Sequence, residues 1–238
     1  MRATVVWTLL AAGLWIAVRC AFAHSGGDDS PPKTFEGLPL LFADDFESGK
    51  AERWEPTDAK AWRVVKQGEN HVYNQFEQSK YEPPVRSPFN RCLVKHVTVG
   101  DFVFEVKVQS TGGDNAHRDL CLFFAFQDPA HLYYVHLGKQ ADPHAHSIFL
   151  VNDAPRVSIA KTRTDGTPWD DGWHRVRIVR RVEPGTVAVY FDDMEKPIMT
   201  AEDKHFARGR VGIGSFDDSG NFDDVRLWGT KVDPAKVQ

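Results

Sequence analysis

Two neighbouring stretches decide the fold: DFVFEVKVQ at residues 101–109 and DLCLFFAFQ at residues 119–127. In the first, apolar side chains alternate with mostly polar ones, which predicts a β-strand with one buried face. In the second, both alternating sets are apolar, so we expect a central strand that is covered on both sides. Its two predicted faces carry Leu120, Leu122, Phe124 and Phe126 on one side and Cys121, Phe123 and Ala125 on the other.

A third run, HLYYVHLG at residues 131–138, follows the Asp128-Pro129 turn. Further alternating runs are separated by turn residues, and no long segment has the helical period. They lie at residues 147–152, 157–161, 174–180, 186–191, 210–215 and 222–228. About ten to twelve short strands at this spacing predict an all-β fold, a two-sheet antiparallel β-sandwich.

The composition sets limits on the class of protein. The chain has 238 residues, of which 42% are hydrophobic and 12% aromatic, so it can bury a sizeable core. Its formal net charge is −4 and it has no basic block, which argues against nucleic acid as the main partner. It also lacks the motifs of a serine hydrolase, a P-loop or a dinucleotide-binding fold.

The N-terminus predicts export. Residues 1–23 have a basic residue, a short apolar run and small residues at Ala21 and Ala23, as in a cleaved signal peptide. An uncleaved anchor is the alternative. Residues 24–34 have a linker composition, residues 35–230 form the predicted sandwich, and residues 231–238 form a tail. We therefore expect a secreted or periplasmic protein with no membrane span after signal cleavage.

Two cysteines, Cys92 and Cys121, remain after signal cleavage. An exported protein can join two cysteines in a disulfide. Because Cys121 lies in an apolar strand, two buried free thiols are an equally good interpretation.

Three segments resemble concanavalin A-like, laminin-G-like jelly-roll domains: DDFESG (44–49), FAFQDPAHLYYVHLG (124–138) and GRVGIGSFDDSGNFDDVRLWG (209–229). Within this superfamily they are most similar to the 3-keto-disaccharide hydrolase-like domains of exported bacterial proteins. The resemblance implies a carbohydrate ligand at a concave face. Its members include glycoside hydrolases, polysaccharide lyases and non-catalytic carbohydrate-binding modules, so the fold does not choose an activity.

The sequence departs from the best-marked catalytic members of this superfamily. It has no E-x-D-x-x-E strand of the laminarinase type. VRSPFN (85–90) and YYVHLGKQ (133–140) only partly match the strands of the alginate-lyase type. We therefore expect carbohydrate binding and leave open whether a glycoside is hydrolysed or a polysaccharide is cleaved by elimination. A non-catalytic adhesion or structural domain that binds protein partners is the alternative.

The strand at residues 131–138 carries the main candidate site. The period of two puts Tyr134 and His136 on one face, and Tyr133, Val135 and Leu137 on the core face. The resemblance implies that the first face lines the groove. There Tyr134 would offer a flat surface to a sugar ring, and His136 would donate a hydrogen bond or transfer a proton as the candidate catalytic residue. A half-buried strand with a satisfied histidine is the alternative.

Further candidate ligand-binding residues follow from side-chain chemistry, because sugar sites need planar hydrogen-bonding groups and aromatic surfaces. Arg118 suits the carboxylate of a uronate. Arg175, Arg177 and Arg180 predict either an anion site or a solvated outer face. The other candidates at the groove are Tyr73, Asn74, Gln75, Tyr81, Arg86, Asn90, Lys139 and His146.

Two metal sites are conceivable, although no cofactor is required. His144 and His146 have H-x-H spacing and with His136 would form a zinc site; exposed or sugar-binding histidines are the alternative. The resemblance also implies a structural calcium between the terminal strands. Its oxygen ligands would be Asp45 or Glu47 with Asp223 or Asp224, and turns capped by these aspartates are the alternative.

Overall fold

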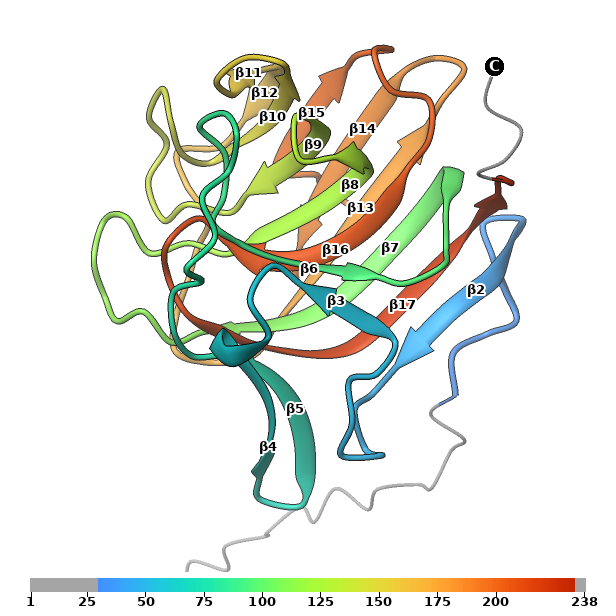
Figure 1. Cartoon of the computed structure of the whole chain (residues 1–238). Coiled ribbons are helices and arrows are strands. Elements are labelled where there is room, and N and C mark those ends of the chain that lie inside the picture. The colour runs from blue at the N-terminus through green and yellow to red at the C-terminus, as the bar shows by residue number, and fades with distance from the viewer. Residues whose placement is uncertain (1–29, 234–238) are drawn as a thin grey trace, which may run out of the picture. The chain divides into compact units, whose positions relative to one another are not determined.

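The computed structural model describes residues 30–233, which form antiparallel strands and one short 3₁₀-helix, η1 at Ala59–Ala61 (Figure 1). The predicted signal peptide and parts of the predicted linker and tail lie outside the described residues. The strands are β1 Thr34–Phe35, β2 Leu38–Asp44, β3 Trp54–Pro56, β4 Trp62–Gln67, β5 Asn70–Gln75, β6 Asn90–Val94, β7 Val99–Ser110, β8 Cys121–Asp128, β9 His131–His136, β10 Ser147–Asn152, β11 Val157–Ser158, β12 Ala160–Arg163, β13 His174–Arg181, β14 Thr186–Phe191, β15 Met199–Glu202, β16 Arg210–Ser215 and β17 Gly220–Lys231.

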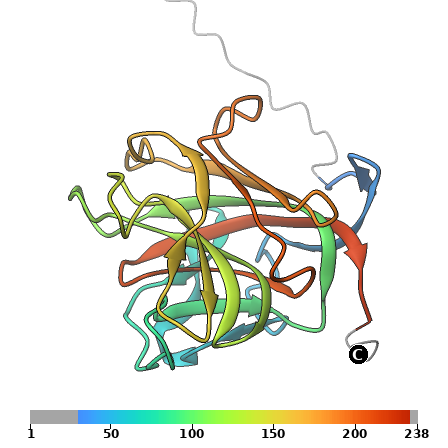
Figure 2. The same cartoon turned by 90° about the horizontal axis from the view of Figure 1, so that it is seen from above.

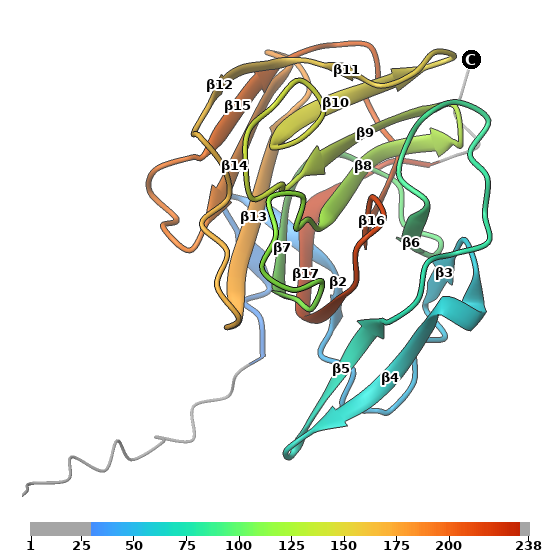
Figure 3. The same ribbon diagram turned by 90° about the vertical axis from the view of Figure 1, so that its left-hand side faces the viewer.

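The strands form two stacked sheets, which confirms the predicted two-sheet sandwich (Figure 2). The ten-stranded sheet has the order β1-β2-β17-β7-β13-β14-β15-β12, and the β4–β5 hairpin joins it through β17. Figure 3 shows this hairpin projecting from the sheet. The seven-stranded sheet has the order β11-β10-β9-β8-β16-β6-β3. The strands outnumber the prediction because several are too short to leave a periodic signal in the sequence.

The main core lies between the two sheets. The inward side chains of β7, Phe102, Phe104, Val106 and Val108, are at most 1% exposed. In β9, Tyr133 and Val135 also point into this core, as alternation predicts. Full burial of each such aromatic or aliphatic side chain contributes about 1.5–3 kcal/mol to folding, so this layer dominates the stability.

A β-bulge in β8 changes the predicted faces of that strand. Ala125 has a positive φ of 47°, and the pairing with β9 shifts register between Phe124 and Asp128. Ala125 therefore packs in the inter-sheet core, whereas Phe126 belongs to the outer cluster, the reverse of strict alternation. A Cβ on Gly209 would lie 2.2 Å from the Ala125 carbonyl carbon, so the bulge requires glycine there.

A second apolar layer covers the outer face of the seven-stranded sheet. It contains Leu93, Cys121, Phe123, Phe126, Leu132, Tyr134, Phe149, Val151 and Phe216. Val85 and Phe89, from the segment between β5 and β6, pack on it. Arg156 adds a guanidinium 4.0 Å from the centre of the Phe216 ring. This face is therefore closed over its centre by side chains.

Cys92 and Cys121 are buried free thiols in the described part of the chain. Cys92 packs in the inter-sheet core and Cys121 in the outer cluster, so they lie on opposite faces of the seven-stranded sheet. Among residues 30–233, no helix has the length and apolar character needed to cross a membrane.

The close contact between β16 and β6 gives a stability prediction. A Cβ on Gly212 would lie 2.4 Å from the Cys92 carbonyl oxygen, so Gly212→Ala must push the two strands apart. We expect it to lower the free energy of unfolding by about 1–3 kcal/mol in urea denaturation. Gly100→Ala is the matched control, because its Cβ would meet no atom closer than 3.7 Å. Equal stability of the two variants would contradict this packing.

Candidate functional site

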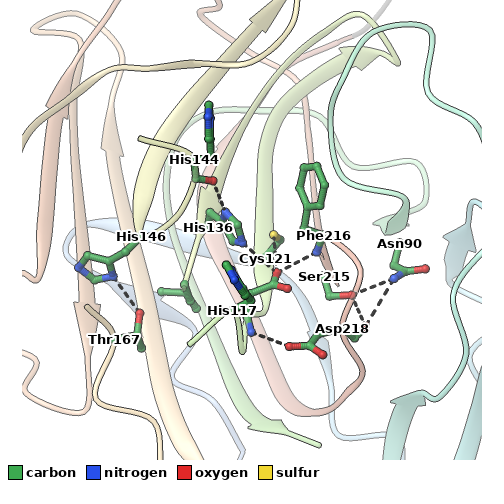
Figure 4. Close-up of polar contacts among 12 residues, drawn as sticks. Asn90, His117, Cys121, His136, His144, His146, Thr167, Ser215, Phe216 and Asp218 are labelled. Atoms are coloured by element: carbon green, nitrogen blue, oxygen red, sulfur yellow. Dashed lines mark hydrogen bonds and ion pairs between the residues drawn. The ribbon is translucent and has the colours of Figure 1, made fainter. Parts of the chain in front are cut away.

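Three buried polar side chains meet on the outer face of the seven-stranded sheet. Cys121 and His136 are directly opposite each other in the β8–β9 pairing, so their side chains lie side by side. Asp119 precedes Cys121 by two residues and therefore shares its face. His136 is 6% exposed, Asp119 1% and Cys121 0%. Figure 4 shows His136 and Cys121 on their adjacent strands.

The carboxylate of Asp119 is the hub of this cluster. Its Oδ2 accepts from the Phe216 amide at 2.8 Å and from the Cys121 thiol at 3.5 Å, and it lies 3.2 Å from His136 Nε2. His136 Nδ1 lies 3.0 Å from the His144 carbonyl oxygen (Figure 4). The His144 carbonyl oxygen can only accept, so Nδ1 donates to it, and Nε2 shares one hydrogen with the Asp119 carboxyl group.

Two more carboxyl groups lie near this cluster. Asp218 Oδ2 accepts from the Asp119 amide at 2.9 Å. Burial raises the pKa of Asp218, and burial followed by the negative charge of Asp119 raises the pKa of Asp217. Protonation of these groups becomes easier because charge accumulates in a poorly solvated place.

The structure corrects the predicted role of Tyr134. Its side chain is on the predicted face but is 0% exposed, stacked on Phe149 with the ring centres 5.2 Å apart. Val85 and Phe89 pack on the cluster that contains it, so no sugar ring can reach its face. Burial also raises the pKa of its hydroxyl, which has no hydrogen-bond partner among the described residues.

Tyr73, Gln75 and Arg118 are also structural rather than accessible. Tyr73 is 4% exposed in the inter-sheet core, and Gln75 Oε1 accepts from the Ser215 hydroxyl at 2.9 Å. Arg118 is 2% exposed, and its guanidinium donates to Ser110 and to the Asp170 carbonyl at 2.8 Å. Their hydrogen-bonding groups hold loops together, so they do not line a groove.

His146 does not join His136 in a three-histidine zinc site. Its Nδ1 lies 3.0 Å from the Thr167 hydroxyl and its Nε2 2.9 Å from the Thr164 hydroxyl, as Figure 4 shows for Thr167. Both ring nitrogens are therefore engaged. Burial, the largest cause, lowers the pKa of His146 to about 4, and the Arg163 charge acts in the same direction.

Two candidates remain at the surface. Arg86 is exposed, with its guanidinium 5.5 Å from the centre of the Phe216 ring. Lys139 is paired with Asp114.

The predicted calcium ligands do not gather into one cluster within residues 30–233. Glu47 accepts from the His71 amide at 2.7 Å, and Asp45 accepts from the Glu47 amide as a turn cap. Asp224 pairs with Lys107 at 2.5 Å. Asp223 accepts from Asn70 at 2.8 Å, and burial raises its pKa. Asp45 thus caps a turn, which is the alternative to its predicted role as a calcium ligand.

An open cleft lies instead on the outer face of the ten-stranded sheet. Arg175, Lys107 and Asp223 are cross-strand neighbours on β13, β7 and β17, and they form a polar row across the sheet. Asn70, at the start of β5, donates to Asp223 from one side. Trp173, just before β13, stands at the other side. The cleft, with a volume of about 340 Å³, is lined by Asn70, Lys107, Trp173, His174, Arg175, Asp192 and Asp223.

Trp173 is 36% exposed, which is unusual for so large an apolar side chain. No ring or cation stacks on its indole among the described residues, whereas Trp169, four residues earlier, packs edge-on against Phe191. Its flat face is therefore available to a ligand.

The charges around the cleft are balanced. Arg175 Nε lies 3.7 Å from Glu105, and Lys107 pairs with Asp224. Asp192 Oδ1 accepts from the Arg175 amide at 2.9 Å, and Oδ2 lies 2.8 Å from His174 Nδ1. The walls thus offer fixed donors and acceptors without a dominant charge.

A second hollow, of about 500 Å³, lies near the bulge of β8 and is lined by His96, Thr98, Phe126, Gln127, Arg208, Gly209 and Arg210. Phe126 is its one aromatic group and is 5% exposed. The guanidinium groups of Arg91 and Arg210 lie 4.5 and 5.2 Å from the centre of that ring. The ring is already occupied, so this hollow is the weaker candidate.

The sequence reasoning missed Trp173, Asn70, Lys107 and Asp192 as site residues. The available signal was WDDGW, in which a polar turn separates two tryptophans. Trp169 is 7% exposed, so one of the two is core and the other is not. Trp173 comes directly before β13, and polar side chains on the outer face of that strand are spaced two residues apart.

No protein-family model matches the chain, and no curated protein sequence matches it. Several solved structures share its fold. The carbohydrate-binding module CBM66 from Bacillus subtilis has 16% identity and a TM-score of 0.54, covering 74% of this chain and 96% of that one. Domain 4 of AbnA, an arabinanase of Geobacillus stearothermophilus solved with arabinotriose, has 12% identity and a TM-score of 0.52, covering 84% and 96%.

The winged bean acidic lectin, solved with methyl-α-D-galactose, has 12% identity and a TM-score of 0.53, covering 81% of this chain and 99% of that one. These similarities establish the fold. The chain has the two-sheet jelly-roll fold that these structures share, and this is the fold that the resemblance of its sequence implied.

The burial of His146 predicts a pH dependence. The pKa of His146 is about 4 in the folded chain and 6.5 when the side chain is exposed to solvent, as in the unfolded chain. Between these pH values only the unfolded chain binds the proton. Neutral His146 therefore contributes to the free energy of unfolding above pH 6.5. This contribution is lost as the pH falls toward 4, and the loss is about 3 kcal/mol at most.

We expect the free energy of unfolding of His146→Gln to fall less steeply than that of the wild type between pH 6.5 and 4, measured by urea denaturation. The other titrating groups are the same in both proteins and cancel in the comparison. Parallel curves would show that His146 is not held neutral.

Proposed function

We propose that this protein is an exported carbohydrate-binding protein whose ligand sits in the cleft beside Trp173. The observation that carries the proposal is an unstacked indole, 36% exposed, at the edge of a row of polar side chains. Carbohydrates present apolar ring faces and many hydroxyls, so they are recognised by an aromatic surface combined with planar donors and acceptors.

The polar side chains suit this task. Lys107, Arg175 and Asn70 offer donors, and Asp192 and Asp223 offer acceptors, all around one cleft. Its volume of about 340 Å³ is within the range of small-ligand sites. The row is built on three hydrogen-bonded strands, so the floor of the site is held rigidly before the ligand arrives.

Binding without cleavage is the function that the cleft supports best. Glycoside hydrolysis usually needs two carboxyl groups that are free to act on the scissile bond. Here both oxygens of Asp192 are held by His174 and the Arg175 amide. Those of Asp223 are held by Asn70 and the Asp224 amide. These carboxylates position other groups and are not free to attack or protonate a sugar.

The fold and the N-terminal sequence also support this proposal. Three structures of the same fold carry sugar-related names, two of them with a bound sugar, arabinotriose or methyl-α-D-galactose. The predicted signal peptide at residues 1–23 would bring the chain to the secreted or periplasmic space, where polysaccharides are found.

The proposal predicts that Trp173→Ala weakens oligosaccharide binding at least tenfold, about 1.4 kcal/mol. The ligand would be chosen on a glycan array that includes arabino- and galacto-oligosaccharides, and affinities would be measured by isothermal titration calorimetry. Phe76→Ala is the matched control, because Phe76 is 37% exposed but does not line the cleft. Equal losses in both variants, or unchanged binding by Trp173→Ala, would refute the site.

Hydrolysis and lyase assays on the same oligosaccharides separate recognition from cleavage. We expect binding and no product. Product formation would show that a catalytic group operates, and its persistence in Trp173→Ala would place that group outside the cleft. Absence of binding across the array would favour a domain that binds protein partners.

A further inference from the structure

We propose that Asp119, Cys121 and His136 form a binding site for one zinc ion on the outer face of the seven-stranded sheet. This site is separate from the Trp173 cleft, which lies on the other sheet, and does not depend on the proposed carbohydrate function.

The placement of the three side chains follows from the strand pairing. Cys121 and His136 are an opposed pair on β8 and β9, and Asp119 lies two residues before Cys121 on the same side. Their ligand atoms, one from each residue, all lie within 4.8 Å of one another. Cys121 and His136 are thus held by two hydrogen-bonded strands. Asp119 lies just before β8, where the carbonyl groups of Arg118 and Leu120 accept from the amides of Lys139 and Leu137, so ordering the three ligands costs little.

The distances between these atoms suit a tetrahedral ion. With bonds of about 2.0–2.3 Å, the ligand atoms of a tetrahedral zinc site lie roughly 3.3–3.7 Å apart. Here the Asp119 Oδ2 atom lies 3.2 Å from His136 Nε2 and 3.5 Å from Cys121 Sγ. Two of the three distances are therefore close to those of a zinc site, and the third, between His136 Nε2 and Cys121 Sγ, is within 4.8 Å.

The chemistry of the donors selects the metal. Imidazole and thiolate with one carboxylate form a mixed set that zinc accepts, whereas calcium and magnesium take oxygen ligands. On binding, zinc replaces the hydrogen shared by His136 Nε2 and Asp119 Oδ2 and the proton on Cys121 Sγ, and both protons go to solvent. The thiolate and the carboxylate then balance the charge of Zn²⁺, so the buried site becomes neutral.

Two further observations point to a ligand here. Asp119 Oδ1 is buried and has no hydrogen-bond partner within the described residues, although a buried unpaired carboxylate oxygen is costly. His136 Nδ1 is held by the His144 carbonyl oxygen. A metal-bound histidine commonly donates its second ring N–H to such a carbonyl, which fixes the ring for coordination.

All three side chains are buried, and His136 is the most exposed of them at 6%, so an ion would enter past its ring. Three protein ligands leave one tetrahedral position, which a water molecule would fill. The site has the ligand number of an open zinc centre rather than of a closed structural one.

Cobalt(II) is the direct probe, because a cobalt–thiolate bond gives a charge-transfer absorption band in the near ultraviolet. We expect the full chain to bind one cobalt ion with this band and with the visible bands of tetrahedral geometry, and zinc to displace it. Cys121→Ser should lose the charge-transfer band. Cys92→Ser should keep it, because Cys92 is an equally buried free thiol whose Sγ lies beside Tyr73.

Zinc affinity and thermal unfolding complete the test. We expect His136→Gln to weaken zinc binding by roughly tenfold or more, and zinc to raise the unfolding temperature of the wild type but not of this variant. Absence of the band in the wild type, its survival in Cys121→Ser, or equal zinc binding by wild type and His136→Gln would overturn the proposal. Oligosaccharide binding unaffected by chelator would leave the cleft proposal standing on its own.

Discussion

The pairing of β8 with β9 is the constraint on which the rest of the structure depends. Both strands bury side chains on two faces, one in the inter-sheet core and one in the outer apolar cluster. The outer cluster is completed by Val85 and Phe89, so the centre of this face is closed to large ligands. Buried polar side chains on this face, such as Asp119 and His136, must therefore find their hydrogen-bond partners among themselves. The open polar surface is left to the ten-stranded sheet.

The sequence predicted the sandwich because alternation reports which side chains share a face. It placed Tyr133 and Val135 in the core correctly. It also predicted that the strand containing Phe123 is covered on both sides, which is confirmed. The prediction that Tyr134 is exposed at a groove was wrong. Tyr134 is the cross-strand partner of Phe123, so the layer of side chains that covers Phe123 also covers Tyr134. Pairing register, which carries this information, cannot be read from one strand alone.

The cleft could not be predicted for a different reason. Asn70, Lys107, Arg175 and Asp223 come from four strands that are far apart in the sequence, and only the sheet order brings them together. Each alone is an ordinary charged or polar residue on the exposed face of a strand. Burial was equally hidden for Arg118. Its guanidinium donates to the carbonyl oxygens of Ser110, at the end of β7, and Asp170, in the loop before β13, and no sequence pattern marks these partners.

We expect sugar to bind over the row of polar side chains beside Trp173 and not over the face that contains His136. Nuclear magnetic resonance titration of the ¹⁵N-labelled chain with an oligosaccharide ligand tests this directly. The indole N–H signal of Trp173 and the backbone signals of Lys107 and Arg175 should shift on binding. Shifts confined to Arg86, His136 and their neighbours would contradict it.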